Sequence, residues 1–231
     1  MAKLAYCDLH RIGYDQAAQL QQRLVRKMID HRDDPKCDRA VLLLCEHEPV
    51  ITLGRAADEK HVLANPSKLE ELGIQLVKTS RGGDVTYHGP GQIVGYPIMR
   101  LDCRGRNVHG FIRNLEEVII QVLAELGVSA QRQQGLTGVW VGNEKVAAIG
   151  IAVSRWISYH GFSINVQGPL PGFGLIVPCG ISDRGVTSIS KILGMEVSIE
   201  QVKPLILEKF AQIMNFDQIE AILSVENLFN D

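Results

Sequence analysis

Residues 81–92, RGGDVTYHGPGQ, place four glycines among side chains that can bind or react. Glycine lets the backbone adopt positive φ and approach a ligand closely. Arg81 carries a permanently charged guanidinium, and Thr86, Tyr87 and His88 add hydrogen-bonding groups. Apolar runs flank the stretch on both sides, so we predict a ligand-binding loop. The alternative is a tight connection between strands whose polar residues bind nothing.

Cys179 is the candidate nucleophile. It lies between Pro178 and Gly180, without the apolar alternation that would bury it as a packing residue. A thiol reacts as the thiolate, which requires a nearby positive charge or a helix N-terminus. The other cysteines fit packing or surface positions, and a structural role for Cys179 is the alternative. These four are Cys7, Cys37, Cys45 and Cys103.

Lys145 begins a predicted strand of small and apolar residues, KVAAIG. Strict alternation places Lys145 on the face of Ala147 and opposite Ala148. The small side chains leave room for a ligand to approach the backbone. Beside Cys179, a buried lysine would share a proton with the thiol, whereas a lysine at a strand end is more often solvated.

The elements that must position these residues follow from periodicity. Helical spacing predicts helices at residues 13–31, 67–73, 108–126, 199–214 and 217–228. Apolar runs predict strands at residues 4–9, 40–45, 50–53, 74–79, 93–99 and 157–166, and a hairpin over 139–151 that turns at Gly142-Asn143. Pro97 predicts an edge strand or a bulge. We expect an α+β fold, a mixed β-sheet flanked by helices, in a single domain spanning residues 1–231.

Composition excludes several classes of protein. Hydrophobic residues at 45% and charged residues at 22% are ordinary globular values. A formal net charge of -2 argues against nucleic acid as the main partner, and no apolar run reaches the length of a membrane span or a signal peptide. Five scattered cysteines without a CxxC pair favour free thiols in a reducing cytoplasm over disulfides or a zinc site.

Four motifs occur in order along the chain: RGGDVTYHGPGQIVGYPI, GVWVGNEKVAAIGI, HGFSINV, and VPCGI followed by GVTSI. Together they resemble the signatures of bacterial lipoyl(octanoyl) transferases over residues 40–193. The resemblance implies the catalytic fold shared with biotin- and lipoate-protein ligases. It also implies transfer of an octanoyl group from acyl carrier protein to a lysine of lipoate-dependent enzyme subunits.

Roles for single residues follow from the same resemblance. Cys179 matches the nucleophile that forms the acyl thioester, and Lys145 matches the lysine that lowers its pKa. Three segments match substrate-contacting positions: Arg81, Gly82, Gly83, Asp84, Val85, Thr86, Tyr87 and His88; Ala148, Ile149 and Gly150; and Gly161, Phe162 and Ser163. No cofactor or metal is implied, because octanoyl arrives on the phosphopantetheine arm of acyl carrier protein. The implied acceptors are lipoyl domains of 2-oxoacid dehydrogenase E2 subunits and the glycine cleavage H protein.

Physical chemistry agrees with this reaction and leaves rivals open. Exchange between thioesters is nearly isoenergetic and the final amide is more stable, so ATP is not needed, and no GxxxxGK[ST] phosphate loop occurs. An ATP-dependent lipoate-protein ligase would share the glycine-rich loop and the strand lysine but would not need Cys179. Two other classes are a non-catalytic module that binds carrier or lipoyl domains, and a papain-like hydrolase with His88 or His160 as base.

Overall fold

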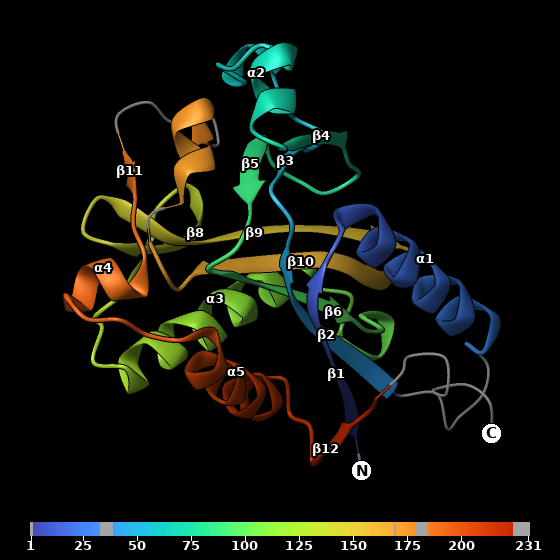
Figure 1. Cartoon of the computed structure of the whole chain (residues 1–231). Helices are drawn as coiled ribbons and strands as arrows, with labels where there is room; N and C mark the ends of the chain where they lie inside the picture. Colours follow the sequence, from blue (N-terminus) through green and yellow to red (C-terminus); the bar gives the residue numbers. More distant parts are fainter. Residues whose placement is uncertain (1, 33–38, 169, 179–183, 224–231) are drawn as a thin grey trace.

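The computed structural model describes residues 2–32, 39–168, 170–178 and 184–223. Two β-sheets form the centre of the fold, and helices cover both faces of the larger one (Figure 1). The larger sheet runs in the order β12 (Gln218–Ala221), β1 (Lys3–Ile12), β2 (Arg39–His47), β6 (Gln92–Ile98), β10 (Ile157–Asn165), β9 (Glu144–Ser154), β8 (Leu136–Val141) and β7 (Gln131–Gln133), with β11 (Gly185–Val186) beside β9. The smaller sheet runs β4 (Gln75–Lys78), β3 (Val50–Leu53) and β5 (Val85–His88).

Two helices, α3 (Val108–Glu125) and α5 (Ile199–Ile213), pack on one face of the larger sheet (Figure 1). The helix predicted at residues 108–126 is confirmed, and its Phe111, Leu115 and Val122 are buried in the main core. Asn107 caps the start of α3 by accepting a hydrogen bond from the backbone N–H of Gly110. This helical layer packs on the face of the larger sheet that lies opposite the predicted site.

The opposite face is covered by α1 (Tyr14–Asp30) over strands β1, β2 and β6 and the first residues of β10. The helix predicted at residues 13–31 is confirmed, and its Ala17, Leu24 and Met28 are buried. Because α1 covers only part of this face, residues 148–150 of β9 and 161–163 of β10 face the smaller sheet. None of the described helices is both long enough and apolar enough to cross a membrane.

The smaller sheet has its own apolar core, which includes Ile51, Val85 and Tyr87. It continues into short helical elements: α2 (Pro66–Glu71), η1 (Glu59–His61) and η3 (Pro171–Leu175). Two other short helices, η2 (Asp102–Arg104) and α4 (Ile189–Leu193), lie elsewhere in the fold. The smaller sheet stands over the uncovered part of the larger one (Figure 1).

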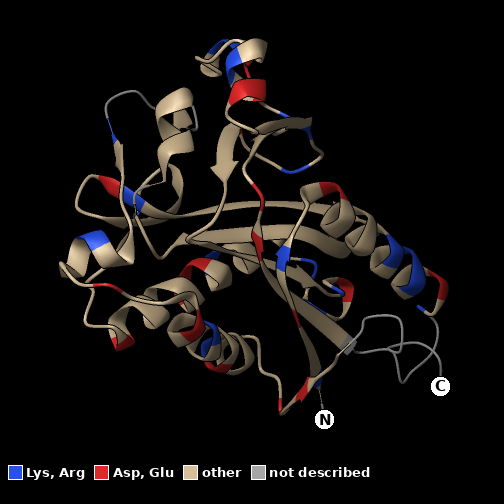
Figure 2. Ribbon diagram, in the orientation of Figure 1, with Lys and Arg blue, Asp and Glu red and all other residues tan. Residues whose placement is uncertain are grey.

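The predicted α+β class is confirmed. The larger sheet is mixed, because β1 is parallel to β2 and β12 while β6, β9 and β10 pair antiparallel. The predicted hairpin is also confirmed, with β8 and β9 joined through Gly142, whose φ is 57°. Charged residues are sparse on the central strands and mixed in sign on the helices (Figure 2).

The predicted helix at residues 217–228 is wrong where the structure describes it. Residues Gln218–Ala221 form β12, which pairs parallel with the edge of β1. The backbone N–H of Asp217 donates to Ala2 O at 3.0 Å, and that of Ile222 donates to Tyr6 O at 2.8 Å. Unpaired backbone groups at a sheet edge outweigh a weak helical periodicity.

The prediction of an edge strand at Pro97 is also wrong, because β6 lies between β2 and β10. The ladder to β10 is instead irregular at this point. Ser158 Oγ donates to Pro97 O at 2.7 Å, and Gln21 Oε1 of α1 accepts the backbone N–H of His160 at 2.8 Å. Side chains thus satisfy the Pro97 carbonyl and the His160 N–H where the ladder is interrupted, beside a residue that has no N–H to donate.

Candidate active site

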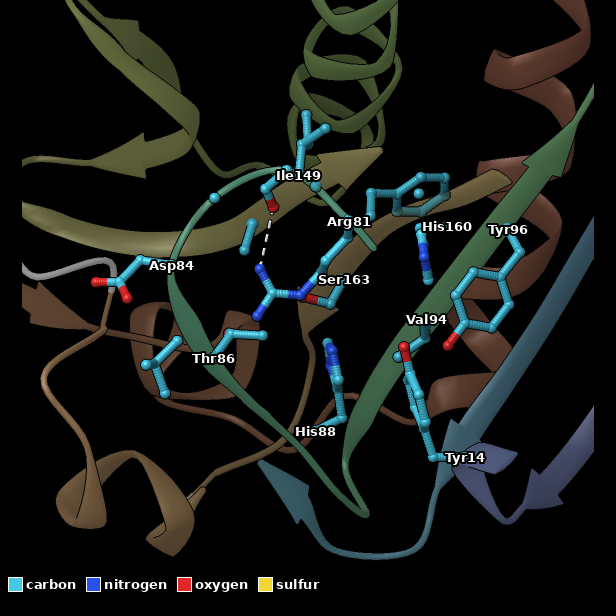
Figure 3. A pocket seen from close by; sticks show the side chains of 17 residues that line it. Tyr14, Arg81, Asp84, Thr86, His88, Val94, Tyr96, Ile149, His160 and Ser163 are labelled. Atoms are coloured by element: carbon cyan, nitrogen blue, oxygen red, sulfur yellow. Dashed lines mark hydrogen bonds between the residues drawn. The ribbon is translucent and has the colours of Figure 1, made fainter. Parts of the chain in front are cut away.

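A cavity lies between the smaller sheet and the uncovered strands of the larger one (Figure 3). Thirteen of the fourteen predicted substrate-contacting residues line it, from the three segments that the sequence analysis singled out. Tyr14, Val94, Tyr96 and His160 complete the lining. Residues far apart in the sequence therefore converge on one site.

Tyr87 is the exception. Side chains alternate along β5, so Thr86 and His88 face the cavity while Tyr87 faces the core of the smaller sheet. Its ring meets Phe173 edge-on, with the ring centroids 5.7 Å apart. The structure therefore places Tyr87 among the residues that support β5, away from the cavity.

Arg81 is held in a fixed orientation at the centre of the lining (Figure 3). Its Nη2 donates to Thr52 O at 2.6 Å and to Thr52 Oγ1 at 2.9 Å, and its Nη1 donates to Gly82 O at 3.1 Å. The side chain is 8% exposed. A buried guanidinium with several fixed hydrogen bonds supplies a positive charge at a defined place in the cavity.

Glycines let the loop approach the strands this closely. A Cβ on Gly54 would lie 2.2 Å from Gly83 O, and a Cβ on Gly150 would lie 2.9 Å from Gly82 O. Both contacts are with backbone atoms, which cannot move aside cheaply. These glycines bring the loop against its neighbouring strands, while the approach of its backbone to a ligand stays a prediction. Strand β5 occupies part of the stretch that we expected to be a loop.

Asp84 turns away from the centre of the cavity (Figure 3). Its carboxylate lies 2.6 Å from His61 Nδ1 and accepts the backbone N–H of Asp58 at 3.1 Å. These bonds tie the start of β5 to η1. Asp84 therefore anchors the loop that leads into β5.

Two histidines face the cavity in the neutral state. Burial, and after it the nearby His47, lowers the pKa of His88 to about 3. Burial, and after it Arg81, lowers the pKa of His160 to about 4, and His160 Nε2 lies 3.0 Å from Ser80 Oγ. Such imidazoles are hydrogen-bonding groups and weak bases, which counts against the papain-like alternative.

A one-residue irregularity determines the orientation of Lys145. The pairing of β8 with β9 shifts between Val139 and Trp140, so that Val146 is an extra residue in β9. Val146 and Ala147 both join the main core against the helices. Lys145 therefore lies on the opposite face, together with its cross-strand partner Trp140.

The strict alternation expected for this strand is wrong for Lys145. The bulge puts Lys145 on the same face as Ala148 and Gly150, which line the cavity. Ala148 lies about 10 Å from Lys145 along the strand. Its Nζ lies 4.7 Å from the centroid of the Trp140 ring, within cation–π range, and the residue is 8% exposed. Lys145 is thus buried, in contrast to a solvated lysine at a strand end.

Cys179 lies outside the described residues. On one side of it, Val177 donates its backbone N–H to His61 O at 2.8 Å. On the other side, Gly185 and Val186 pair in parallel with Glu144 and Lys145. Of the other cysteines, Cys7 and Cys45 are buried and Cys103 is exposed, as expected, and Cys37 also lies outside the described residues.

The sequence analysis missed three lining residues. Val94 and Tyr96 point to the cavity side of β6, and the only local signal for them was the period-two pattern of that strand. Tyr14 reaches the cavity from the first turn of α1. The Tyr96 hydroxyl lies 2.6 Å from His47 Nε2, and burial raises the pKa of Tyr14 to about 12.

The lining combines small and apolar residues with one fixed cation. Glycine and alanine of β9 and β10, together with valine and phenylalanine, form surfaces that suit an alkyl chain. Arg81 and two neutral imidazoles supply polar contacts. Within the described ranges, no three side chains of His, Cys, Asp or Glu gather to hold a metal ion.

Comparison with known proteins agrees with these features. The model of the lipoyl protein ligase A/B catalytic domain matches residues 13–211. An octanoyltransferase of Gloeobacter violaceus is 46% identical over 219 residues, which cover 93% of this chain and 94% of that protein.

Solved structures show the same fold. A bipartite lipoate protein ligase of Thermoplasma acidophilum superposes with a TM-score of 0.71 at 16% identity, over 97% of this chain and 87% of the other. Biotin protein ligase of Aquifex aeolicus superposes with a TM-score of 0.53 at 14% identity, over 93% of this chain and 71% of the other. The predicted likeness to biotin- and lipoate-ligase catalytic domains is therefore confirmed at the level of the fold.

Proposed function

This chain belongs to the octanoyltransferases of the lipoyl protein ligase A/B family, and we propose that it transfers octanoyl from acyl carrier protein to a lysine of a lipoyl domain. The acyl group passes through a thioester on Cys179, and no ATP is used. The acceptors would be the lipoyl domains of 2-oxoacid dehydrogenases and the glycine cleavage H protein.

One observation carries the proposal. Three separated segments, residues 81–88, 148–150 and 161–163, meet at a single cavity with small and apolar walls. Burial of an alkyl chain stabilises binding by about 0.8 kcal/mol per methylene. Arg81 and the histidines would then contact the polar end of the substrate, while Asp84 holds the loop in place through His61.

In the first half-reaction, the thiolate of Cys179 attacks the carbonyl carbon of the carrier thioester. Lys145 holds the proton that the thiol has given up, and its burial over Trp140 keeps the ammonium close to the strand. The new C–S bond forms, the bond to the carrier sulfur breaks, and the proton passes to the departing carrier thiol. Acyl-enzyme and free carrier are the products.

In the second half-reaction, the amine of the acceptor lysine attacks the thioester on Cys179. A primary amine becomes a nucleophile only after it loses its extra proton, and neutral Lys145 accepts a proton as the C–N bond forms. The C–S bond then breaks and Cys179 leaves as the thiolate. The pKa values of the two cavity histidines, His88 and His160, are lowered to about 3 and about 4, so these residues are poor proton acceptors for this step.

The rival on this fold is an ATP-dependent lipoate-protein ligase. To separate the two, the protein is mixed with a lipoyl domain and either octanoyl-carrier protein without ATP, or free octanoate with ATP. Octanoylated lipoyl domain, detected by mass, is expected in the first mixture only. Product in the second mixture alone would identify a ligase, and a lipoyl domain whose acceptor lysine is replaced by arginine serves as the control.

A further inference from the structure

A buried row of hydrogen bonds connects His88 to the backbone of the strand that carries Lys145. His88 Nδ1 lies 2.6 Å from Gln92 Oε1, and Gln92 Nε2 donates to Asn165 Oδ1 at 2.8 Å. Asn165 Nδ2 donates to Thr187 O at 2.9 Å, and the backbone N–H of Thr187 donates to Lys145 O at 3.0 Å. Gln92 is 0% exposed and Asn165 is 4% exposed.

The direction of each bond in this row is fixed from its far end. A backbone carbonyl only accepts, so Asn165 presents its NH₂ group to Thr187 and its Oδ1 to Gln92. Gln92 must then present its own NH₂ group to Asn165, and the same group reaches Tyr87 O at 3.2 Å, a second pure acceptor. Only Oε1 of Gln92 is left for His88.

The tautomer of His88 follows from this geometry. Oε1 of Gln92 can only accept, so Nδ1 of His88 must carry the ring proton. Nε2 of the neutral imidazole then has the free lone pair. The ring extends into the cavity toward Arg81 (Figure 3), where a guanidinium favours an accepting nitrogen over a second donor.

We propose that Gln92 and Asn165 are positioning residues that hold His88 as the Nδ1–H tautomer and so direct an accepting Nε2 at the cavity. The group that Nε2 receives rests on the proposed function: it is an N–H of the incoming lysine amine. His88 would orient this amine toward the acyl carbon while another group takes its proton.

The groups around the ring act against its protonation from several elements. His47 of β2 lies with its ring centroid 6.0 Å from that of His88. Burial is the largest cause that lowers the pKa of His88, and after it His47, Arg81 of the loop and His160 of β10 act in the same direction. The hydrogen bond to Gln92 acts in the opposite direction but does not outweigh them. Burial and the neighbouring charges thus favour neutral His88, and the hydrogen bond to Gln92 fixes its tautomer.

The first test does not depend on the reaction. Long-range ¹H–¹⁵N correlation spectra of the full chain distinguish a protonated ring nitrogen from an unprotonated one, and the spectrum of a His88→Gln variant assigns the signals. We expect Nδ1 to be protonated and Nε2 unprotonated between about pH 5 and pH 8. A proton on Nε2 in this range would overturn the proposal.

The second test uses substitutions of Gln92. Gln92→Met removes the acceptor, so His88 should lose its single tautomer and transfer should fall about tenfold or more in kcat/KM, a fold-change typical of losing one buried hydrogen bond to a reacting group. Gln92→Glu keeps an acceptor for Nδ1–H but adds a negative charge that favours the imidazolium. When the pH is lowered, transfer by this variant should therefore begin to decline at a higher pH than transfer by the wild type.

The exposed Gln212 of α5 provides the matched control, and Gln212→Met should leave spectra and kinetics unchanged. A purely structural Gln92 would leave the pH profile of the Glu variant where it is in the wild type, and that result would overturn the positioning role. If the spectra show the expected tautomer and ATP-free transfer is absent, the proposed function fails while the assignment of His88 stands.

Discussion

At the residue scale, Lys145 combines burial with a side chain that can change its charge. The bulge at Val146 puts it on the cavity face of β9, and its ammonium lies over Trp140. Arginine at this position would keep the positive charge but could not lose a proton at working pH. The two half-reactions should therefore separate in the Lys145→Arg variant.

In Lys145→Arg we expect octanoyl to load slowly onto Cys179 and then to stall. The second half-reaction should slow about a hundredfold or more, because general-base catalysis contributes on that scale. Pre-steady-state sampling that follows acyl-enzyme and acylated acceptor separately measures both steps. Transfer by the variant at a rate close to that of the wild type would show that Lys145 is not the base.

His88 gives a prediction for stability against pH. Burial lowers its pKa to about 3 in the folded chain, whereas a histidine in the unfolded chain titrates near the ordinary value of 6.5. Protons therefore bind the unfolded state first, and stability is full above about pH 6.5 and declines as the pH falls toward 3.

At about pH 5 the loss from one such histidine is about 2 kcal/mol of unfolding free energy. His88→Gln should therefore lose about that much less than the wild type between about pH 7.5 and pH 5, as measured by urea denaturation at each pH. His109→Gln, at an exposed position, is the control and should follow the wild type. Parallel pH curves for wild type and His88→Gln would refute the prediction.

At the scale of elements, α1 completes the sheet where Pro97 interrupts it. Gln21 Oε1 accepts the backbone N–H of His160 at 2.8 Å, and His160 has a φ of 56°. A helix side chain thus holds an irregular point of β10, one residue before the cavity-lining Gly161. Packing of α1 and shape of the cavity are coupled through this bond.

Gln21→Leu should leave the His160 N–H buried without an acceptor. The expected cost is about 1–3 kcal/mol of unfolding free energy, the penalty for one unsatisfied buried donor. Denaturation midpoints measure it, and octanoyl transfer should weaken in parallel because His160 lines the cavity. Gln22→Leu, on the exposed side of the same helix, should change neither quantity; equal effects of the two substitutions would contradict the coupling.

At the scale of the whole molecule, the sequence predicts those elements and site residues that have a local periodicity, a turn signal or a motif. The helix Val108–Glu125 and the hairpin at Gly142 follow from periodicity and turn chemistry. Thirteen lining residues followed from ordered motifs that resemble a known family. That residues 1–231 form a single domain stays a prediction.

The parts that could not be predicted depend on distant partners. Strand β12 forms because it pairs with the edge of β1, and the sequence of residues 217–221 contains no signal for that pairing. Tyr14 reaches the cavity only through the packing of α1, and Lys145 changes face only because β8 pairs with a shifted register. Local periodicity contains none of these contacts.

The central claim is that Cys179 carries the acyl group, and intact-protein mass spectrometry tests it most directly. The protein is mixed with octanoyl-carrier protein, without ATP and without acceptor. We predict a mass increase of one octanoyl group that hydroxylamine removes, that Cys179→Ala abolishes, and that persists in Cys103→Ala, the variant at the exposed cysteine. An unmodified wild-type protein, or an adduct that survives in Cys179→Ala, would contradict the account.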